Sequence, residues 1–277
     1  MPYEFRPGFI YRMPTHFGPS VSPRQGPDGR PFDWSAFEWL RISAIFPSPP
    51  DRLERYMPPG FEPMPDPDIA ITFSYTRNVP WLAGRGYNTF GINVPVYFRG
   101  KNRMEPGSMT MVLWENLAEP IITGREELGF SKLFCDLPDA RQEAGGITCQ
   151  ASWMGFRFAT LHVRELVKVD VGSLPDPSTT RTKGQLLHYR YMPATGDWGA
   201  AAVQEVTMTP CLQGGTTVRA ESGRAKLQWN VPTWEDMPTQ HRIVQSLAEV
   251  VSGEASHAEI VLTRGVDASL RNQCVVS

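Results

Sequence analysis

The stretch that decides the fold is IAITFSYTR, residues 69–77, in which Ile69, Ile71, Phe73 and Tyr75 alternate with small or polar residues. Successive side chains of a β-strand point to opposite sides, so this alternation is typical of a strand with one buried face. Similar runs recur between turn-forming residues: FEWLRISAIF (37–46), INVPVYF (92–98), SMTMVLWE (108–115), ITCQASW (147–153), FATLHVRELVKV (158–169), LLHYRYM (186–192), AAVQEVTM (201–208), TTVRA (216–220), AKLQW (225–229) and AEIVLT (258–263). The pattern predicts a mainly antiparallel β-sheet or barrel.

Helical periodicity is strong in only two places. One is PPDRLERYMPPG (49–60), which ends at a pair of prolines. The other is HRIVQSLAEVVSG (241–253), where Ile243, Leu247, Val250 and Val251 share one face before the terminating Gly253. Helices are therefore expected to be few and short.

The chain reads as one domain with an N-terminal extension. Residues 1–33 are rich in Pro, Gly and Arg and include the turn-forming run SPRQGPDGRP (22–31), which predicts an extended arm. Residues 34–277 contain no linker and no repeat, so we expect a single barrel domain there. Because arms of this kind often lie across a neighbouring subunit, a homo-oligomer is expected.

Composition excludes several classes of function. With 27 basic and 29 acidic residues, the chain lacks the excess of positive charge that nucleic-acid binding requires. Its N-terminus has no apolar core for a signal peptide or membrane span, so we expect a cytoplasmic protein that does not bind membranes. The four cysteines and five histidines show no metal-ligand spacing, and nucleotide-binding motifs are lacking. No cofactor and no metal are expected.

One lysine is unusual in its surroundings. In EPIITGREELGFSKLFCDLPD (119–139), Lys132 lies between Phe130 and Phe134 in an otherwise apolar stretch. From these residues alone, the commoner interpretation is a lysine whose stem covers apolar surface while its amine reaches water.

The run GREELGFSKLF (124–134) resembles the Gly-Arg-Glu and aromatic-x-Lys segment that carries the reactive lysine in the acetoacetate decarboxylase family. Other segments resemble the same family: DRLERYMPPGFEP (51–63), GYNTFGINVPVYFRG (86–100), RAESGRAKLQWN (219–230) and AEIVLTRG (258–265). The resemblance implies a closed, cone-like antiparallel β-barrel with a few short helices. It also implies a cofactor-free lyase that acts on a β-keto acid or related carbonyl compound.

In that family the lysine forms a Schiff base, which makes Lys132 the expected catalytic residue. Only about one lysine amine in two thousand is neutral at pH 7 when its pKa is near 10.4, so the pKa must fall by burial or by a nearby cation. The protonated imine withdraws electrons from the bond β to it. Decarboxylation, aldol-type cleavage and dehydration could all follow, so the lysine alone does not identify the reaction.

The chain departs from the usual decarboxylase pattern at several positions. Leu133 stands where a second lysine normally follows the reactive one, so we expect burial to supply most of the pKa shift. Ser74 and Thr89 align with acidic pocket residues, and Trp39 with an arginine. These replacements predict a substrate that is larger and more apolar than acetoacetate.

Several residues are candidates for the site. Arg41 is the nearest replacement for a carboxylate-binding arginine, because it shares a strand face with Trp39. The alternation in MTMVLWEN (109–116) places Trp114 and Glu115 on opposite faces, and one of the two is expected to line a cavity. Arg125 and Glu126 match the family motif and are expected to form an ion pair that supports the lysine loop. The predicted substrate-binding residues are Arg41, Tyr75, Tyr87, Phe130 and Trp114.

Three functions remain open from the sequence. The first is a Schiff-base lyase with a small-molecule carbonyl substrate. The second is a non-catalytic barrel of the same fold that binds a small ligand, and the third is a structural oligomerisation module. Trapping with borohydride separates the first two, since only a reactive amine with a bound carbonyl gives a stable adduct.

Overall fold

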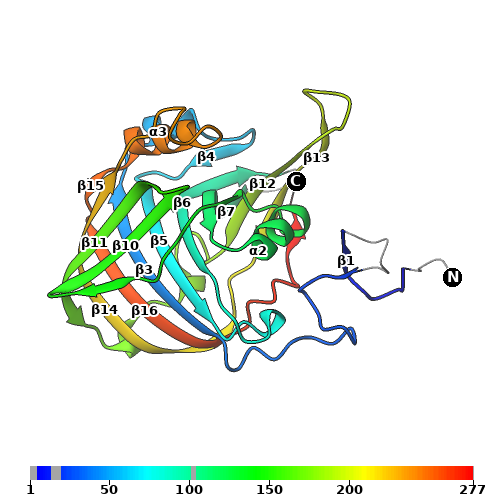
Figure 1. Ribbon diagram of the computed structural model, residues 1–277, viewed down its shortest axis with the longest axis horizontal. Coiled ribbons are helices and arrows are strands. Elements are labelled where there is room, and N and C mark those ends of the chain that lie inside the picture. The colour runs from blue at the N-terminus through cyan, green and yellow to red at the C-terminus, as the bar shows by residue number, and fades with distance from the viewer. Residues whose placement is uncertain (1–4, 14–19, 101–103, 277) are drawn as a thin grey trace.

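The computed structural model describes residues 5–13, 20–100 and 104–276. Strand is the predominant secondary structure of the described residues, with short helices outside the sheet (Figure 1). The strands are β1 (Tyr11–Arg12), β2 (Ser20–Val21), β3 (Glu38–Pro47), β4 (Phe61–Pro63), β5 (Asp68–Arg77), β6 (Asn88–Arg99), β7 (Met104–Glu115), β8 (Lys132–Phe134), β9 (Arg141–Glu143), β10 (Gly146–Trp153), β11 (Phe156–Lys168), β12 (Leu186–Pro193), β13 (Ala201–Thr209), β14 (Gly214–Trp229), β15 (Gly253–Glu254), β16 (His257–Val266) and β17 (Cys274–Val275).

The helices are α1 (Pro50–Glu54), α2 (Ala118–Thr123) and α3 (His241–Val250), with a π-helical turn η2 (Gly124–Leu128) and three 3₁₀ turns, η1 (Pro80–Leu82), η3 (Val171–Ser173) and η4 (Pro177–Thr179). Both segments with predicted helical periodicity contain a helix, and α1 stops well before the proline pair at 58–59. The sequence did not predict α2 and η2, which lead into Lys132.

One large sheet forms the body of the molecule. Its strand order is β17-β13-β12-β7-β6-β5-β3-β16-β14-β11-β10-β9, and β4, β8 and β15 pair with β6, β7 and β14. All neighbouring pairs are antiparallel except β7 with β12 and β7 with β8. The predicted antiparallel, mainly β architecture is therefore confirmed.

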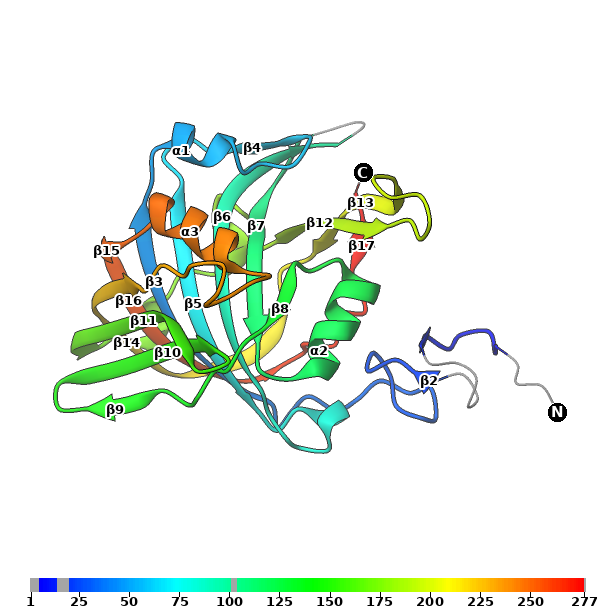
Figure 2. The same ribbon diagram turned by 45° about the horizontal axis from the view of Figure 1, so that its top comes forward.

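The predicted closure of the barrel is corrected. The sheet curls strongly (Figures 1 and 2), but it remains open in the gap between β8 and β10. Strand β8 has only three residues, and beyond it one isolated bridge, Asp136 with Ser152, spans the gap. A ladder that short cannot close the sheet.

The concave side of the sheet is filled by the main core. Alternate residues of β5 point into it, since Ile69, Ile71 and Phe73 are at most 1% exposed. Phe73 stacks on Phe90 with ring centroids 4.2 Å apart, and Phe90 stacks on Trp114 at 5.3 Å. The interior of the sheet is thus packed with aromatic side chains.

A second, smaller core cluster comprises Trp34, Phe37, Val79 and Val266, with Tyr87 packed against it. It lies where the N-terminal segment meets the sheet. Residues 22–26 of the predicted arm are buried against their own chain, on the α2 side of the sheet (Figure 2). The division into an arm (1–33) and a domain (34–277) stays a prediction.

In the part of the chain that the structure describes, no helix has the length and apolar character needed to cross a membrane.

Candidate active site

The register of two parallel strands positions Lys132. In the β7–β8 pair, Lys132 lies opposite Leu113, and Phe134 lies opposite Glu115. Residues two apart on a strand share a face, so Glu115 and Leu113 project to the same side as Lys132. Trp114 projects to the other side, into the main core, where it is fully buried. The lysine and a carboxylate are therefore neighbours on the face turned away from the aromatic core.

Lys132 and Glu115 form a buried pair. The Lys132 Nζ lies 2.9 Å from Oε1 of Glu115, and the two side chains are 8% and 1% exposed. The amine also donates a hydrogen bond to the carbonyl of Pro120 at 3.0 Å and lies 5.1 Å from the centre of the Phe130 ring. Oε2 of Glu115 has no hydrogen-bond partner among the described residues.

Burial favours the neutral form of both groups. It lowers the pKa of Lys132, although the Glu115 carboxylate acts in the opposite direction. Burial likewise raises the pKa of Glu115, against the effect of Lys132. Because two opposite charges in an apolar site lose most of their hydration, moving the proton from the amine to the carboxylate relieves the cost for both. The pair can thus present a neutral amine next to a protonated acid.

The backbone before Lys132 makes room for its side chain. Helix α2 continues into the π-helical turn η2. The first residue of η2, Gly124, lies directly against the lysine. A β-carbon at Gly124 would fall 2.5 Å from Cδ and 2.6 Å from Nζ of Lys132. The turn ends at Gly129, whose φ of 86° is the left-handed conformation that favours glycine. Two of the motif's glycines are therefore required by geometry.

A small cavity of about 40 Å³ adjoins the lysine. It lies between the second core cluster, helix α2 and the C-terminal segment. The charged residues among those that line it are Lys132 and Arg24, both basic. The complete lining is Arg24, Trp34, Phe37, Val79, Trp81, Tyr87, Pro120, Thr123, Leu128, Lys132, Ala268 and Leu270.

Arg24 supplies a cation near the lysine that the sequence did not reveal. Its Nη1 donates to the carbonyl of Ser269 at 2.7 Å, and its Nε lies 3.7 Å from Oε2 of Glu127. The guanidinium acts with burial to lower the pKa of Lys132. Leu133 replaces the family's second lysine, and an arginine from a distant segment provides a positive charge instead.

The predicted substrate-binding residues are only partly brought together. Tyr87 lines the cavity. Burial raises the pKa of its hydroxyl, and the Glu115 charge adds a smaller effect in the same direction. Phe130 lies beside the amine. Tyr75 and Trp114 belong to the main core on the other side of the sheet, and Trp114 donates to Gln240 at 2.6 Å.

Arg41 is also away from the amine. Its guanidinium stacks 4.5 Å from the centre of the Trp39 ring, and it is not part of the lining of the Lys132 cavity. Burial lowers its pKa, with Glu259 acting in the opposite direction. The structure therefore does not bring Arg41 to the lysine.

Arg125 and Glu126, the two motif residues expected to support the lysine loop, take part in hydrogen bonds between an arginine side chain and a backbone carbonyl of the loop. Arg125 donates to the carbonyl of Lys132 at 2.9 Å, and Arg190 donates to the carbonyl of Glu126. Among the ion pairs of the described residues, none joins Arg125 to Glu126. Arg190 pairs with Glu205 at 2.7 Å, which ties the loop to strands β12 and β13.

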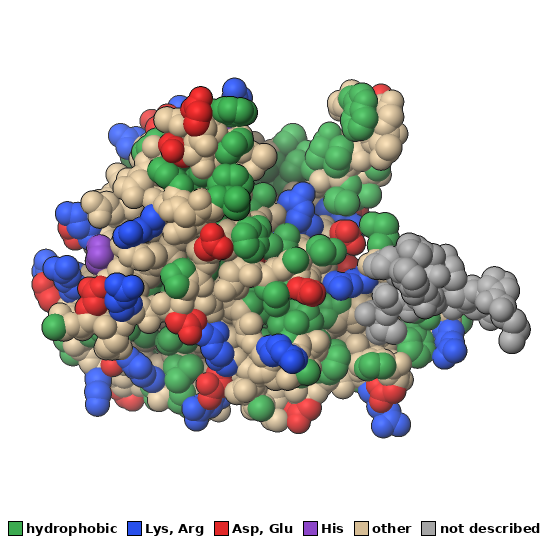
Figure 3. Space-filling view, in the orientation of Figure 1, with side chains coloured by type: hydrophobic (Ala, Val, Ile, Leu, Met, Phe, Trp, Pro, Cys, Tyr) green, Lys and Arg blue, Asp and Glu red, His purple; other side chains and the backbone are tan. Residues whose placement is uncertain are grey.

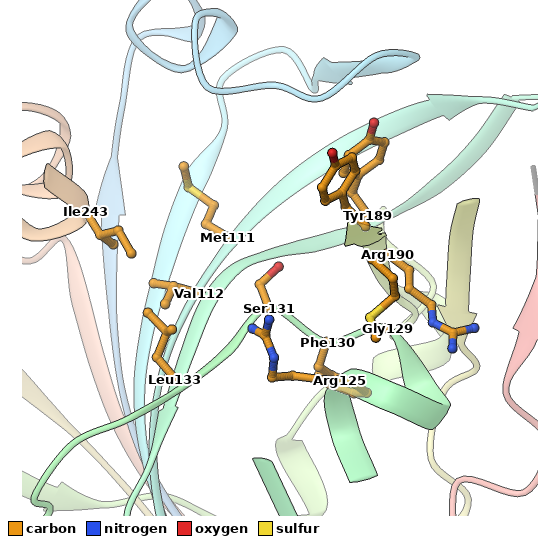
Figure 4. A pocket seen from close by; sticks show the side chains of 12 residues that line it. Met111, Val112, Arg125, Gly129, Phe130, Ser131, Leu133, Tyr189, Arg190 and Ile243 are labelled. Atoms are coloured by element: carbon orange, nitrogen blue, oxygen red, sulfur yellow. The ribbon is translucent and has the colours of Figure 1, made fainter. Parts of the chain in front are cut away.

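A larger pocket lies on the other side of the lysine loop. Its volume is about 290 Å³, and its lining includes Met111, Ser131, Leu133, Tyr189 and Ile243. Figure 4 shows Arg125 and Ser131 in it together with these apolar side chains. In the space-filling view this face is hollowed between α3 and the projecting β12–β13 hairpin (Figure 3). The Lys132 side chain is not part of this lining, whereas it does line the smaller cavity.

His188 is a third residue near the site whose position the sequence did not indicate. Burial, together with the Lys132 charge, lowers its pKa to about 3. Its ring centre lies 3.7 Å from that of Phe130, and Nε2 is 3.0 Å from Oγ1 of Thr209. It is a neutral imidazole that packs behind Phe130.

Of Glu115 and Arg24, the sequence offered a signal for Glu115 alone. Glu115 was one of two alternatives on its strand, and only the strand pairing decides which side faces the lysine. Arg24 gave no usable signal, because it stands in a turn-rich run more than one hundred positions before Lys132.

A family model described as acetoacetate decarboxylase (ADC) matches residues 12–261, which begins inside the predicted arm. No curated protein gives a significant match. The enduracididine biosynthesis enzyme MppR, in complex with pyruvate, is 16% identical with a TM-score of 0.64, over 87% of this chain and 89% of that chain.

Two further solved structures are similar. An acetoacetate decarboxylase from Legionella pneumophila subsp. pneumophila str. Philadelphia 1 is 19% identical with a TM-score of 0.60, over 91% of this chain and 88% of that chain. An acetoacetate decarboxylase-like enzyme from Sphingomonas wittichii RW1 is 13% identical with a TM-score of 0.56, over 84% and 92%. These likenesses establish the fold. Since the family model spans most of the sequence, the chain belongs to the acetoacetate decarboxylase family and is an acetoacetate decarboxylase-like enzyme.

Proposed function

We propose that the protein forms a Schiff base between Lys132 and a small keto acid or related carbonyl compound, and acts on it as a carbon-carbon lyase. The observation that carries the proposal is the buried Lys132–Glu115 pair, with 2.9 Å between Nζ and Oε1. A lysine with a lowered pKa beside a carboxylic acid with a raised pKa is an arrangement suited to imine chemistry.

The chemistry follows from the protonation state of the pair. The neutral Lys132 amine attacks the carbonyl carbon, a carbon–nitrogen bond forms, and the proton held by Glu115 goes to the oxygen. After the nitrogen loses a proton to Glu115, the acid returns it to the hydroxyl, which leaves as water. The product is a protonated imine. In the decarboxylation of a β-keto acid, the bond between the carboxylate and the carbon next to the imine carbon then breaks. Its electron pair forms the carbon–carbon double bond of an enamine while the C=N pair moves to the nitrogen, and carbon dioxide leaves.

The size of the cavity favours a small substrate. A volume of about 40 Å³ leaves little space beside the amine, which argues against the larger, more apolar substrate expected from Ser74 and Thr89. Both of those residues lie on β5 and β6 and are not in the cavity lining. MppR is similar in fold and was solved with pyruvate, which supports a small oxo acid here.

The proposal is tested by trapping. Incubation with acetylacetone at pH 7 should give an enaminone absorbance, and pyruvate with borohydride should leave one stable adduct on Lys132, located by peptide mass. Lys132→Ala should abolish both signals. Lys226→Ala is the matched control, because Lys226 is largely exposed and paired with Glu254. Reaction only near pH 10, or adducts spread over exposed lysines, would refute the proposal.

The alternative is a non-catalytic protein of the same fold that binds a small ligand. It is favoured by the larger pocket of about 290 Å³, which does not include the lysine. The alternative predicts ligand binding without adduct formation, and it survives only if Lys132 fails the trapping test.

Two expectations from the sequence remain predictions. A homo-oligomeric state rests on the proline-rich N-terminal segment, and light scattering that shows a concentration-independent monomer would contradict it. The cytoplasmic location is likewise an expectation from the sequence alone.

A further inference from the structure

Three buried polar groups around the Lys132 cavity have no hydrogen-bond partner within the described part of the chain. They are Nε of Arg24, Nε1 of Trp34 and Oγ1 of Thr123, and all three residues line the cavity. The residues are 6%, 7% and 2% exposed. Leaving a buried donor unsatisfied destabilises the folded protein, because the donor has lost its hydrogen bond to water. Three such groups around one cavity indicate a ligand that brings hydrogen-bond acceptors.

The charges around the cavity indicate the sign of that ligand. Arg24 is only loosely neutralised, because Glu127 lies 3.7 Å from its Nε and accepts a hydrogen bond from Ser22 at 2.7 Å. Arg24 and Lys132 are the charged residues of the lining. Glu115 is engaged with the lysine. An apolar cavity with a buried guanidinium therefore favours an anion.

The geometry points to a carboxylate-binding subsite formed by Arg24, Trp34 and Thr123, facing the Lys132 amine across one cavity. A guanidinium presents a planar fork of donors that matches the two oxygens of a carboxylate. The inference rests on the proposed function and narrows its substrate to oxo acids whose carboxylate lies close to the carbonyl. It also makes the N-terminal segment part of the site.

The subsite differs from what the sequence predicted. Arg41 was the expected carboxylate ligand, but it stacks on Trp39 and does not line the cavity. Arg24 is held by the carbonyl of Ser269 at 2.7 Å. That bond uses one donor, Nη1, and leaves Nε without a hydrogen bond.

The first test is independent of imine formation. Lactate carries the carboxylate of pyruvate but has no carbonyl to react with an amine, and lactamide is its neutral counterpart. Calorimetric titration of the full chain should detect lactate and not lactamide. Arg24→Gln should weaken lactate binding by about 10- to 100-fold, as expected for the loss of a charged hydrogen bond. No difference between lactate and lactamide would overturn the subsite.

The matched control is Arg30→Gln. Arg30 belongs to the same N-terminal segment, its side chain is 85% exposed, and it pairs with Asp28 on the surface. Lactate binding should be unchanged in this variant. An equal loss in Arg30→Gln and Arg24→Gln would refute the assignment to Arg24. If Arg24→Gln unfolds, Thr123→Val serves instead, because it removes one hydroxyl without changing the shape and should weaken lactate several-fold.

The second test separates this inference from the proposed function. In borohydride trapping, Arg24→Gln should raise the pyruvate concentration for half-maximal labelling of Lys132 about 10-fold or more, while labelling by the neutral pyruvamide should change less than about 3-fold. Equal effects on both compounds would overturn the subsite and leave the Schiff base intact. Lactate binding without any labelling would support the subsite and refute the Schiff base.

Discussion

Gly124 and Lys132 are packed so closely that a β-carbon on the glycine would fall 2.6 Å from the lysine Nζ. The glycine begins the π-helical turn, and its φ of −65° is one that any residue adopts. Its lack of a side chain therefore serves the position of the lysine and not the local backbone. This relationship gives the Gly-Arg-Glu motif a physical meaning that the sequence pattern alone does not carry.

The first prediction concerns Gly124→Ala. The backbone accepts alanine, so the fold should persist, but the new methyl group should push the amine away from Glu115. We expect the yield of enaminone with acetylacetone at pH 7 to fall about 10-fold or more, because small misplacements of reacting groups are costly. The measurement is the absorbance of the adduct, with a thermal melt to establish folding.

Gly172→Ala is the control for that variant, because the nearest atoms to a β-carbon there are 3.6 Å away in Asp170. It should react like the natural chain. A Gly124→Ala protein that forms the adduct at the natural rate would show that the close packing has no bearing on reactivity.

The second prediction concerns Glu115→Gln. The Glu115 carboxylate raises the pKa of Lys132, so its removal should lower that pKa further and move the pH profile of adduct formation toward lower pH. The proton that assists loss of water is lost at the same time, so borohydride labelling by pyruvate should be slower at every pH, by about 100-fold. A pH profile that shifts to lower pH together with a lower maximal rate would support both roles of Glu115, as the group that raises the pKa of Lys132 and as the proton donor. A profile shifted to higher pH would contradict the assigned role.

The sequence predicted the strands well because one buried face imposes a period of two. Ile69, Ile71 and Phe73 point into the core as their alternation indicated. Closure of the barrel was not predictable, since it depends on whether the three-residue strand β8 pairs along its whole length with β10, and a single bridge is formed instead.

The site was predictable only where it is local in sequence. The motif around Lys132 indicated a buried amine, and the structure buries it. The side of β7 that faces the amine depends on the register with β8, which places Glu115 and not Trp114 beside it. Arg24 comes from a segment without periodicity, and its position is fixed by contacts with Glu127 and Ser269. Such contacts leave no pattern in a single sequence.

The third prediction concerns His188 and pH. Burial lowers its pKa from 6.5 to about 3, so the unfolded chain binds a proton that the folded chain does not between those values. The histidine therefore costs stability as the pH falls below 6.5. The free energy of unfolding of the natural chain should fall as the pH is lowered from 7 to 4.5. In His188→Phe, which keeps a ring against Phe130, this fall should be smaller by about 2–3 kcal/mol. Urea unfolding at the two pH values measures this, and parallel losses would refute it.

The last prediction treats the Lys132–Glu115 pair as a cost to folding that function requires. Replacing a buried ion pair with apolar residues is often neutral or stabilises a protein by about 1–4 kcal/mol, whereas removing one partner leaves the other unpaired. The double variant Lys132→Met with Glu115→Leu should therefore unfold at higher urea concentration than the natural chain and form no adduct.

The single variant Lys132→Met should behave differently with pH. Burial raises the pKa of Glu115 above its ordinary value of 4.5, and loss of the lysine removes the charge that opposed this rise. A carboxyl whose pKa is raised in the folded state stabilises it at low pH and loses that contribution as the pH rises from 4.5 through the folded pKa. Lys132→Met should therefore lose stability relative to the double variant between pH 5 and pH 8, as urea titrations at each pH would measure. If the two variants keep a constant difference across this range, Glu115 is ionised throughout it in the folded single variant, its pKa is not raised, and the neutral pair is the wrong description.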